Sequence, residues 1–473
     1  ANRYQNIFVV GDDFQSIYSF RGAKIENINR FIEDFKGKLI LLEKNYRSTT
    51  QILNLANEVI KHNPNQIKKV MYSNHKEGAY PFYYQASSER AEAQFVVDKI
   101  KKYYLNGDSY RDFAVMYRTN SISRVFEDTL IKHQIPYVIY GGLSFFARKE
   151  IKNMVAYLRV LVNPKDDFSF IRIVNEPKRK IGSTLLERLT MHATENQLSL
   201  FEAIPSFEAS GVGVKALKAF YQMMISIQEQ LNNMPLKNII DVLLSETGYK
   251  DMLALEDPDH ERIGNVYELK NVLKETDETV EGDAFTKLES LLYDLSLRTD
   301  NENNEQVDAV ILSTFHQVKG LEFKNVFMVA MEEGIFPSEY HIEDLDIEEE
   351  RRICYVGVTR AKERLYLTSA ATRMLYGQRS FASPSRFIKE MGSDCLKNVT
   401  AELERKKKFV YQEAKPVIEN KNKEEYSTGD KVMHNVFGKG IIVSIDEASI
   451  KVAFSAPTGV KVLLKDHPSY HKI

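Results

Sequence analysis

The sequence lacks several features that would assign it to a class at once. It has no tryptophan, only two cysteines, and no run of about 20 apolar residues, the length that a membrane-spanning helix needs. Cys354 and Cys395 have no partner at metal-ligand or disulfide-framework spacing, so we expect neither a metal site nor a structural disulfide. These absences favour a cytoplasmic protein with no membrane partner.

Charge of one sign is also lacking, because 64 basic side chains face 66 acidic ones and the formal net charge is −2. This balance removes the simplest argument for nucleic-acid binding, which rests on a large positive field. Any DNA contact therefore has to come from local patches. The acidic run 339–350 and the basic run 404–408 are local, but such runs are usually solvated faces or linkers.

The N-terminus carries no signal peptide and no initiator methionine, since the chain opens with Ala1, Asn2 and Arg3. We expect a truncated or processed start.

Short β-branched or aromatic runs alternate with helical patterns over the first 160 residues. The predicted strands are 7–10, 38–42, 82–85, 113–117 and 136–140. Helices are predicted between them, at 49–61, 91–104 and 150–162. This alternation is typical of a parallel α/β sheet.

The alternation stops near residue 165, and apolar residues then recur every three or four positions to about residue 304, which predicts helix throughout. Strands resume at 309–314, 325–330 and 365–369, so the helical block interrupts one sheet domain. A polar segment to about residue 425 is typical of a linker. Four short strands follow, at 431–434, 440–445, 450–454 and 460–464, and they predict a small β-barrel.

Four strings place reactive side chains at element ends. Residues 11–23 follow the first predicted strand, and Tyr46 and Arg47 precede a capped helix. A polar loop begins after Thr314 and reaches Glu322, and a helical segment ends in Arg360. From chemistry alone each has an ordinary alternative: a strand–turn–helix junction, a structural ion pair, an unremarkable loop and a charged amphipathic helix.

Taken together and in this order, the strings resemble motifs of superfamily 1 DNA helicases of the UvrD, PcrA and Rep type, with the PcrA branch most similar. The resemblance implies roles at the nucleotide. Gln15 would sense the terminal phosphate of ATP, Tyr46 would pack on adenine, and Glu322 would bond the ribose. Arg47 would reach the terminal phosphate, where a planar guanidinium suits phosphate oxygens. Arg360 would act as an arginine finger.

The same resemblance implies DNA contacts. Tyr18 and Phe20 would stack on single-stranded bases, with Arg21 matching the same string, although Phe20 stands where the family commonly has Trp. The family's residues that couple to the DNA backbone match Thr314, His316, Lys319, Arg118 and Asn120.

Weaker similarities concern duplex DNA and the tail. Ile181 and Gly182 lie in a string that resembles a duplex-contacting motif. Phe381 aligns with an aromatic pin that splits base pairs, and a packed hairpin Phe remains the alternative. The tail resembles a Tudor-like end, which implies contact with RNA polymerase.

The implied architecture is α/β, with a RecA-like parallel-sheet motor domain, a large all-helical insertion, a partial first RecA-like domain and a Tudor-like barrel. The predicted divisions are 1–42 for the end of the first RecA-like domain, 43–164 and 306–395 for the second, 165–305 for the helical insertion, 396–425 for the linker and 426–473 for the barrel.

Such a motor holds ATP and Mg²⁺ with Gly-x-x-x-x-Gly-Lys-[Ser/Thr] and an acidic strand end. Gly-Lys occurs only at 37–38 and 438–439, and neither fits that pattern. We expect the C-terminal portion of a 3′–5′ helicase of DNA repair or replication, associated with a bacterial nucleoid and acting on single-stranded DNA and its junctions with duplex. The alternative is a non-catalytic, truncated helicase-like protein that binds DNA or RNA polymerase.

Overall fold

A computed structural model describes residues 7–18, 26–74, 77–257, 261–296, 308–338, 344–375, 377–403, 426–435, 437–446, 449–455, 459–465 and 470–473. The chain separates into two compact units, Ala1–Thr400 and Ala401–Ile473. Each unit is described by itself.

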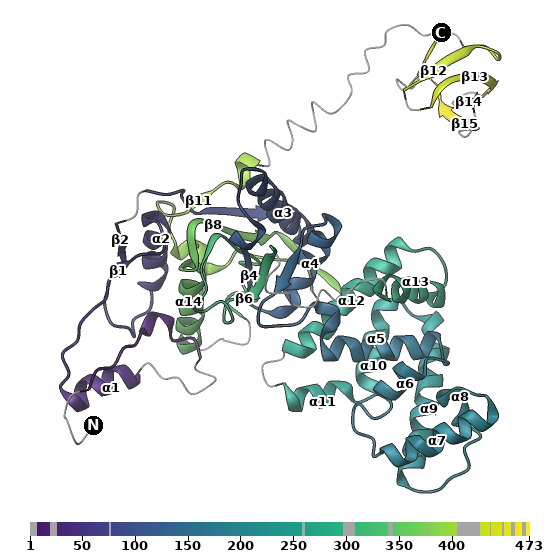
Figure 1. Ribbon diagram of the computed structural model, residues 1–473, viewed down its shortest axis with the longest axis horizontal. Helices are drawn as coiled ribbons and strands as arrows, with labels where there is room; N and C mark the ends of the chain where they lie inside the picture. The colour runs from purple at the N-terminus through teal and green to yellow at the C-terminus, as the bar shows by residue number, and fades with distance from the viewer. Residues whose placement is uncertain are drawn as a thin grey trace. The chain divides into compact units, whose positions relative to one another are not determined.

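The first unit is built on a seven-stranded sheet with the order β11-β3-β8-β7-β4-β6-β5 (Figure 1). Every neighbouring pair in it runs parallel. The strands are β3 (Phe82–Ala86), β4 (Phe113–Tyr117), β5 (Tyr137–Ile139), β6 (Val310–Thr314), β7 (Phe323–Met328), β8 (Ala361–Ala370) and β11 (Lys397–Asn398). The predicted α/β class with a parallel sheet is confirmed.

Helices cover both faces of this sheet, which is why its inner strand β4 is apolar along its whole length. Ala114 and Met116 of β4 pack in one core with α2 (Thr50–Ile60) and α14 (Asp344–Val358). Val115, between them in sequence, points to the opposite core with α3 (Glu89–Leu105) and α4 (Ser123–Lys132). A short helix, α15 (Arg386–Glu390), adds Phe387 to the first of these cores.

A helical segment lies between β5 and β6 in the chain and has a core of its own (Figure 1). α5 belongs to that core, because Ile151, Met154 and Leu158 are among its buried residues. The helices are α5 (Lys149–Val162), α6 (Asp167–Ile173), α7 (Ser183–Asn196), α8 (Leu200–Ala203), α9 (Val212–Gln230), α10 (Ile239–Glu246), α11 (Tyr249–Glu256), α12 (Glu261–Thr279) and α13 (Ala284–Ser296).

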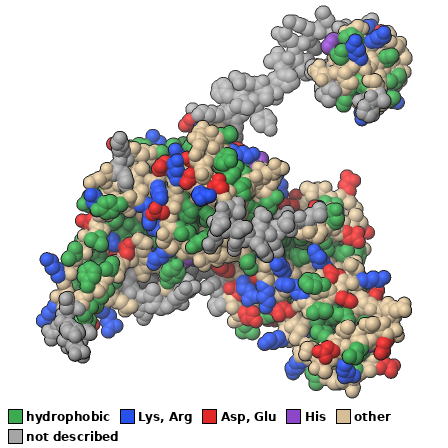
Figure 2. All heavy atoms as spheres, in the orientation of Figure 1, with side chains coloured by type: hydrophobic (Ala, Val, Ile, Leu, Met, Phe, Trp, Pro, Cys, Tyr) green, Lys and Arg blue, Asp and Glu red, His purple; other side chains and the backbone are tan. Residues whose placement is uncertain are grey.

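Two predicted strands, 7–10 and 38–42, are wrong. Both stretches are extended without strand pairing, and their apolar side chains are exposed, with Phe8 at 84% and Leu42 at 75%. A strand needs a neighbour for its backbone hydrogen bonds, and no described strand pairs with either stretch. Around them lie η1 (Asp13–Gln15), α1 (Glu26–Phe35) and a small parallel pair, β1 (Lys44–Asn45) with β2 (Tyr72–Ser73). Figure 2 shows hydrophobic side chains on the surface around α1.

A hairpin of β9 (Thr372–Leu375) and β10 (Gln378–Phe381) follows β8. Its first strand is held by a buried ion group, because the Arg373 guanidinium donates to the Glu332 carboxylate at 2.8 Å and to Glu92 at 2.5 Å. Both carboxylates are fully buried and also accept backbone bonds, from Ala370 and Ala330. Buried charges persist only when they are paired and hydrogen-bonded in this way.

The second unit is a five-stranded antiparallel sheet with the order β15-β14-β13-β12-β16. Its strands are β12 (Lys431–His434), β13 (Gly438–Ile445), β14 (Ser449–Phe454), β15 (Val460–Leu464) and β16 (Tyr470–Lys472). Val432, Ile442 and Val452 form the centre of its core. The four predicted strands are present, and the short β16 was missed. Since β15 and β16 are edges of the described sheet, the Tudor-like barrel stays a prediction.

No helix among the described residues combines the length and the apolar character needed to cross a bilayer. Acidic and basic side chains are interspersed over the visible face of the first unit (Figure 2).

Candidate functional site

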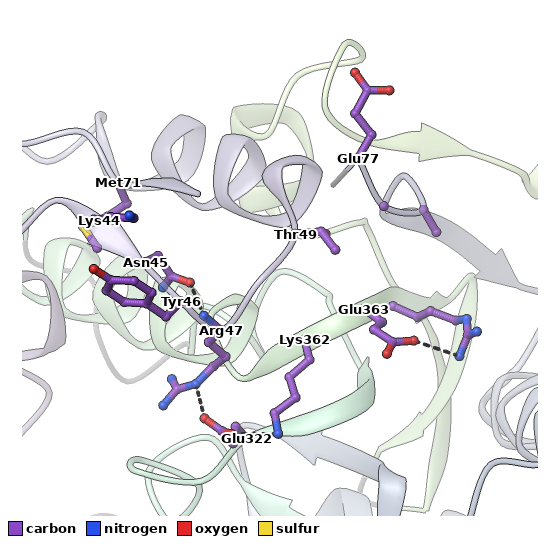
Figure 3. A pocket seen from close by; sticks show the side chains of 13 residues that line it. Lys44, Asn45, Tyr46, Arg47, Thr49, Met71, Glu77, Glu322, Lys362 and Glu363 are labelled. Atoms are coloured by element: carbon purple, nitrogen blue, oxygen red, sulfur yellow. Dashed lines mark hydrogen bonds and ion pairs between the residues drawn. The ribbon is translucent and has the colours of Figure 1, made fainter. Parts of the chain in front are cut away.

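A cavity of ≈ 1030 Å³ opens beside the start of α2. Its wall combines the turn between β1 and α2, residues 77–79, and the residues around the starts of β7 and β8 (Figure 3). The lining residues are Lys44, Asn45, Tyr46, Arg47, Thr49, Met71, Glu77, Gly78, Ala79, Glu322, Lys362, Glu363 and Arg364.

The turn between β1 and α2 is fixed by its own side chains. The Asn45 amide oxygen accepts from the backbone N–H groups of Arg47 at 2.8 Å and Ser48 at 2.9 Å, so the chain folds back sharply before the helix. The Ser48 hydroxyl donates to the carbonyl of Ala361 at 2.6 Å, and the Thr49 amide donates to that of Lys362 at 3.1 Å. The start of α2 is therefore pinned to the start of β8.

Three charged side chains meet on one wall of the cavity (Figure 3). Arg47 Nε lies 2.7 Å from one carboxylate oxygen of Glu322, and Lys362 Nζ lies 2.7 Å from the other. Arg47 also donates to the carbonyl of Thr359 at 3.2 Å. Hydrogen bonds from Lys362 and then from Arg47 hold the pKa of Glu322 below its usual value. This wall holds two cations against one anion, so it favours a ligand with negative charge.

Tyr46 presents an aromatic face beside this charged wall, with 74% of its surface exposed. The Lys44 ammonium lies 5.1 Å from the ring centroid. An exposed ring on a fixed turn provides a stacking surface for a flat ligand at little cost in conformational entropy.

Arg360 does not line the cavity. Its side chain is 2% exposed and donates inward, to the carbonyls of Val356 at 3.0 Å and Leu321 at 3.1 Å and to the Thr359 hydroxyl at 3.2 Å. Burial, and then the positive charge of Arg47, lowers the pKa of Arg360 to about 10. The predicted arginine finger is thus held within the protein, close to the cavity wall.

The segment around η1 packs on the sheet domain through both side chains and backbone. Phe14 is buried edge-on against Tyr355 of α14, with ring centroids 5.3 Å apart. Arg352 Nε donates to the carbonyl of Ser16 at 3.0 Å, and Lys319 Nζ donates to that of Gln15 at 2.9 Å. The segment of Gln15, the predicted phosphate sensor, is therefore bonded to Lys319 and Arg352, which belong to two other predicted motifs.

The Gln15 side chain itself donates to the carboxylate of Asp12 at 2.6 Å. Nearby, the Tyr18 hydroxyl donates to the carbonyl of His316 at 3.0 Å, and the Lys319 ammonium lies 5.1 Å from the Tyr18 ring centroid. Tyr18 thus joins His316 and Lys319, which lie far from it in sequence, in one aromatic and basic patch.

The family of UvrD-like helicase C-terminal domains matches residues 40–372, more than half of the chain. The chain belongs to the UvrD-like helicase family. The UvrD/REP helicase N-terminal domain matches residues 1–36 as well.

Two relatives illustrate the similarity to this UvrD-like helicase chain. It is 40% identical over 466 residues to the ATP-dependent DNA helicase PcrA of Staphylococcus epidermidis, covering 94% of this chain and 63% of the relative. It is 38% identical over 468 residues to the PcrA of Staphylococcus aureus, covering 94% of this chain and 64% of the relative. The chain therefore spans less than two thirds of the length of these relatives.

A solved structure, the C-terminal domain of a possible DNA helicase from Lactobacillus plantarum, covers 75% of this chain and 98% of its own at 10% identity. Its TM-score of 0.30 is too low to support an argument about the fold.

Two residues that the UvrD-like resemblance assigns to the DNA backbone are bonded within the protein. Arg118, at the end of β4, lies 2.7 Å from the carboxylate of Glu350 on α14, and both side chains are mostly buried. Burial acts to lower the pKa of Arg118, but Glu350 outweighs it and the pKa is raised. The Asn120 amide donates to Glu261 of α12 at 3.2 Å. In this conformation both residues position other elements of the chain.

The remaining predicted DNA contacts differ in exposure. Thr314 is buried at the end of β6. Ile181 is buried, while Gly182 is exposed at the N-cap of α7. Phe381 is 93% exposed at the end of β10. Phe20 and Arg21 lie outside the described residues.

Sequence reasoning missed two lysines of the cavity. Lys362 pairs with Glu322, and Lys44 places its ammonium over the Tyr46 ring. Lys362 follows the predicted finger by two positions at the start of a strand, and that place was a usable signal. Among the residues that the structure describes, no group of three His, Cys, Asp or Glu side chains could hold a metal ion.

The Glu322 ion group generates a pH prediction. In Lys362→Met we expect the pKa of Glu322 to rise toward its ordinary value of 4.5, because the stronger of its two hydrogen bonds is lost. The ion group should contribute to stability above the ordinary pKa, and that contribution should fade as the pH falls through the lowered folded-state pKa. Carboxyl-carbon NMR titration measures the shift, with Glu322→Gln identifying the signal.

Arg364→Met is the matched control, because Arg364 lines the same cavity but pairs with Asp108. An unchanged Glu322 titration in Lys362→Met, or an equal change in Arg364→Met, would count against the ion group described.

Proposed function

We propose that this chain is part of an ATP-dependent DNA helicase that moves 3′ to 5′ on single-stranded DNA and unwinds duplex during repair or replication in the bacterial cytoplasm. The observation that carries the proposal is the meeting of Arg47 and Glu322, 275 positions apart, on the wall that also presents Lys362 and the Tyr46 ring. A nucleotide needs these three chemistries together: a stacking face, a ribose acceptor and phosphate cations.

The cavity residues fit one side of ATP. Tyr46 would stack on the base, Glu322 would accept from a ribose hydroxyl, and Arg47 and Lys362 would bind phosphate oxygens. When phosphate arrives, Arg47 has to exchange its bond to Glu322 for a bond to the ligand. ATP bound with Mg²⁺ supplies the energy of the cycle. The described residues offer no carboxylate cluster that fits the Mg²⁺ ion.

Arg360 would complete the site by leaving its bonds to Val356 and Leu321 and turning toward the transferred phosphate. Exchanging carbonyl partners for phosphate oxygens favours the charged ligand, because charge-assisted bonds are the stronger ones. Since Arg360 lies beside the cavity wall, its movement would occur only when nucleotide binding rearranges that wall. Such a step makes hydrolysis conditional on closure.

Single-stranded DNA would follow the patch made by Tyr18, His316 and Lys319, where a ring offers stacking and an ammonium offers phosphate contact. Phe381 would stack at the junction with duplex, and the segment of Ile181 and Gly182 would contact the duplex backbone. Because Lys319 also holds the Gln15 carbonyl, DNA binding at this patch is linked physically to the predicted phosphate sensor.

In the protein as its gene encodes it, Arg360→Ala should lower DNA-stimulated ATP hydrolysis by about a thousandfold or more, because the finger neutralises charge that develops in the transition state. Arg360→Lys should stay folded yet remain strongly impaired, since an ammonium lacks the planar donors. Steady-state ATPase assays with single-stranded DNA measure both.

Arg111→Ala serves as the control for this pair, because Arg111 is an exposed arginine that pairs with Asp308. Wild-type hydrolysis in a folded Arg360→Ala protein would sink the finger assignment.

The alternative is a non-catalytic helicase-like protein that binds DNA or RNA polymerase. It is favoured by one observation: the 473 residues contain no Gly-x-x-x-x-Gly-Lys-[Ser/Thr] string. We propose that this chain alone does not hydrolyse ATP, because the described cavity would contact only one side of a nucleotide.

Titration of the 473-residue chain with a fluorescent ATP analogue tests this proposal. We expect binding weaker than about micromolar, reduced further by Arg47→Ala, because one cation pair and one ring give only part of the contact that tight binding needs. Glu363→Gln is the control, since Glu363 lines the cavity without contacting Arg47 or Glu322 in the structure. Submicromolar affinity would contradict an incomplete phosphate site.

We further propose that the second unit contacts RNA polymerase. Its outer face supports this, because Ala453 of β14 pairs with Ile441 on one side and Val460 on the other, which aligns the three side chains in a row. Val460 and Val462 are 60% and 62% exposed. Exposed apolar patches of this kind commonly mark protein contacts.

Replacing Val460 and Val462 together by lysine should weaken binding of purified RNA polymerase by about tenfold or more, because two apolar anchors are lost from the patch. Biolayer interferometry with the immobilised chain measures the change. Val70→Lys, at a similarly exposed valine of the first unit, should leave binding unchanged. Equal affinity of the double variant and the wild type would remove the second unit as the contact.

A further inference from the structure

The β9–β10 hairpin carries Phe381 in an unusual setting for an aromatic residue. Arg373 and Met374 of β9 are buried, while β10 is largely exposed and Phe381 packs on little of the protein. Phe381 pairs with Thr372 across the hairpin. Its position is therefore set by the hairpin backbone, and whatever holds β9 also holds Phe381.

One anchor lies within the sheet domain. Arg373 of β9 is clamped by Glu92 and Glu332, and the Thr372 hydroxyl donates to the carbonyl of Ser87 at 2.9 Å. These bonds fix the base of the hairpin. The turn lies at the opposite end of β9.

From the helical segment, the side chain of Asn271 bonds the backbone on both sides of the turn. Asn271 of α12 accepts from the backbone N–H of Gly377 at 2.8 Å and donates to the carbonyl of Met374 at 3.2 Å. Met374 lies in the first strand and Gly377 precedes the second, so a single amide bridges both sides of the turn. Gly377 has φ +77°, which suits glycine, and Asn271 is 1% exposed.

The amide of Asn271 is itself oriented. Its nitrogen also donates to Glu268 at 2.6 Å, and the other carboxylate oxygen of Glu268 accepts from Arg124 of α4 at 2.5 Å. Because Glu268 can only accept when ionised, it directs the amide nitrogen toward itself and toward Met374, and leaves the amide oxygen for Gly377. Hydrogen bonds therefore run without interruption from Arg124 through Glu268 and Asn271 to the hairpin turn.

We propose that Asn271 is a positioning residue that fixes the β9–β10 hairpin, and with it Phe381, to the helical segment. The proposal rests on the proposed function for the idea that Phe381 acts at a DNA junction. The hydrogen bonds from the Asn271 side chain to Met374 and Gly377, called the clasp below, do not depend on that function. Without the amide, two buried backbone groups lose their partners, and the turn gains freedom to move toward water.

The absence of tryptophan from the chain makes the clasp directly measurable. Phe381→Trp introduces a single indole at the exposed position, and time-resolved fluorescence anisotropy then reports the local motion of that side chain. In this background Asn271→Ala should increase the amplitude of fast motion. Asn271→Asp, nearly the same in shape, should loosen the hairpin as well, because it loses the donor and places a carboxylate beside Glu268.

Asn265→Ala is the matched control. Asn265 is an asparagine of the same helix with 4% exposure, but its side chain bonds Arg148 and Glu150 and does not touch the hairpin. It should cost similar thermal stability and leave the motion of the indole unchanged. The proposal is overturned if Asn271→Ala and Asn271→Asp both leave the indole as ordered as before, or if Asn265→Ala loosens it equally.

A second readout separates the clasp from the role of Phe381. In the protein as its gene encodes it, Asn271→Ala should slow duplex unwinding by roughly tenfold to a hundredfold, the range that misplacement by ~1 Å can cost. The kcat and KM of DNA-stimulated ATP hydrolysis should stay at wild-type values. Loss of ATPase activity in step with unwinding would overturn the assignment of Asn271 to the hairpin.

Junction DNA added to the Phe381→Trp variant should quench the indole if this position meets the fork. Quenching by junction DNA supports the role of Phe381 at the fork, and an indole that is ordered but loosens in Asn271→Ala supports the clasp. An indole that loosens in Asn271→Ala but ignores junction DNA would end the proposed role of Phe381 and leave the clasp standing.

Discussion

The parallel direction of the seven strands is the constraint on which the rest of the first unit depends. Each strand must be followed by a connection that returns from the carboxyl edge of the sheet to its amino edge. Between β6 and β7 this return is made by residues 315–322 alone, and these two strands, of five and six residues, each span about 17–20 Å. The loop therefore has His316 near one edge and Glu322 at the other. The loop thus joins His316, a predicted DNA contact, to Glu322, a predicted nucleotide contact.

A second connection crosses the same sheet as a helix. α14 holds Arg118 through Glu350 near the carboxyl end of β4, and its last turn leads directly to Arg360 at the amino end of β8. An α-helix rises ~1.5 Å per residue, so α14 crosses from one edge of the sheet toward the other. Since Lys319 and Arg352 bond the neighbouring carbonyls of Gln15 and Ser16, the segment around η1 rests on both crossings. The cavity wall and the patch of Tyr18, His316 and Lys319 are therefore connected by two packed paths.

The sequence was informative where burial on both faces leaves a signature. The run 113–117 is apolar without alternation, and it forms the inner strand β4. The helix predicted at 49–61 is α2 within a residue at each end. The same logic failed at 7–10 and 38–42, where apolar composition occurs without a described partner strand. The sequence also could not predict that the side chains of Arg118 and Arg360 bond groups within the protein. The partner of Arg118, Glu350, is 232 positions away, and the Arg360 guanidinium is satisfied by backbone carbonyls that no pattern of residue types reveals.

The attachment of the helical segment shows why its interface escaped prediction. Along α12, polar side chains three or four positions apart face the sheet domain, and each has one partner or more there or in the adjoining loop: Glu261 with Asn120, Asn265 with Arg148, Glu268 with Arg124, Asn271 with the hairpin, and Glu275 with Arg90. A polar stripe of this spacing normally indicates a solvated face. Here these five side chains are paired across an interface. Such an interface gains little from hydrophobic burial and depends on the geometry of its bonds. The helical segment is thus held in one register by directional contacts, and the hairpin that bears Phe381 inherits its position from that register.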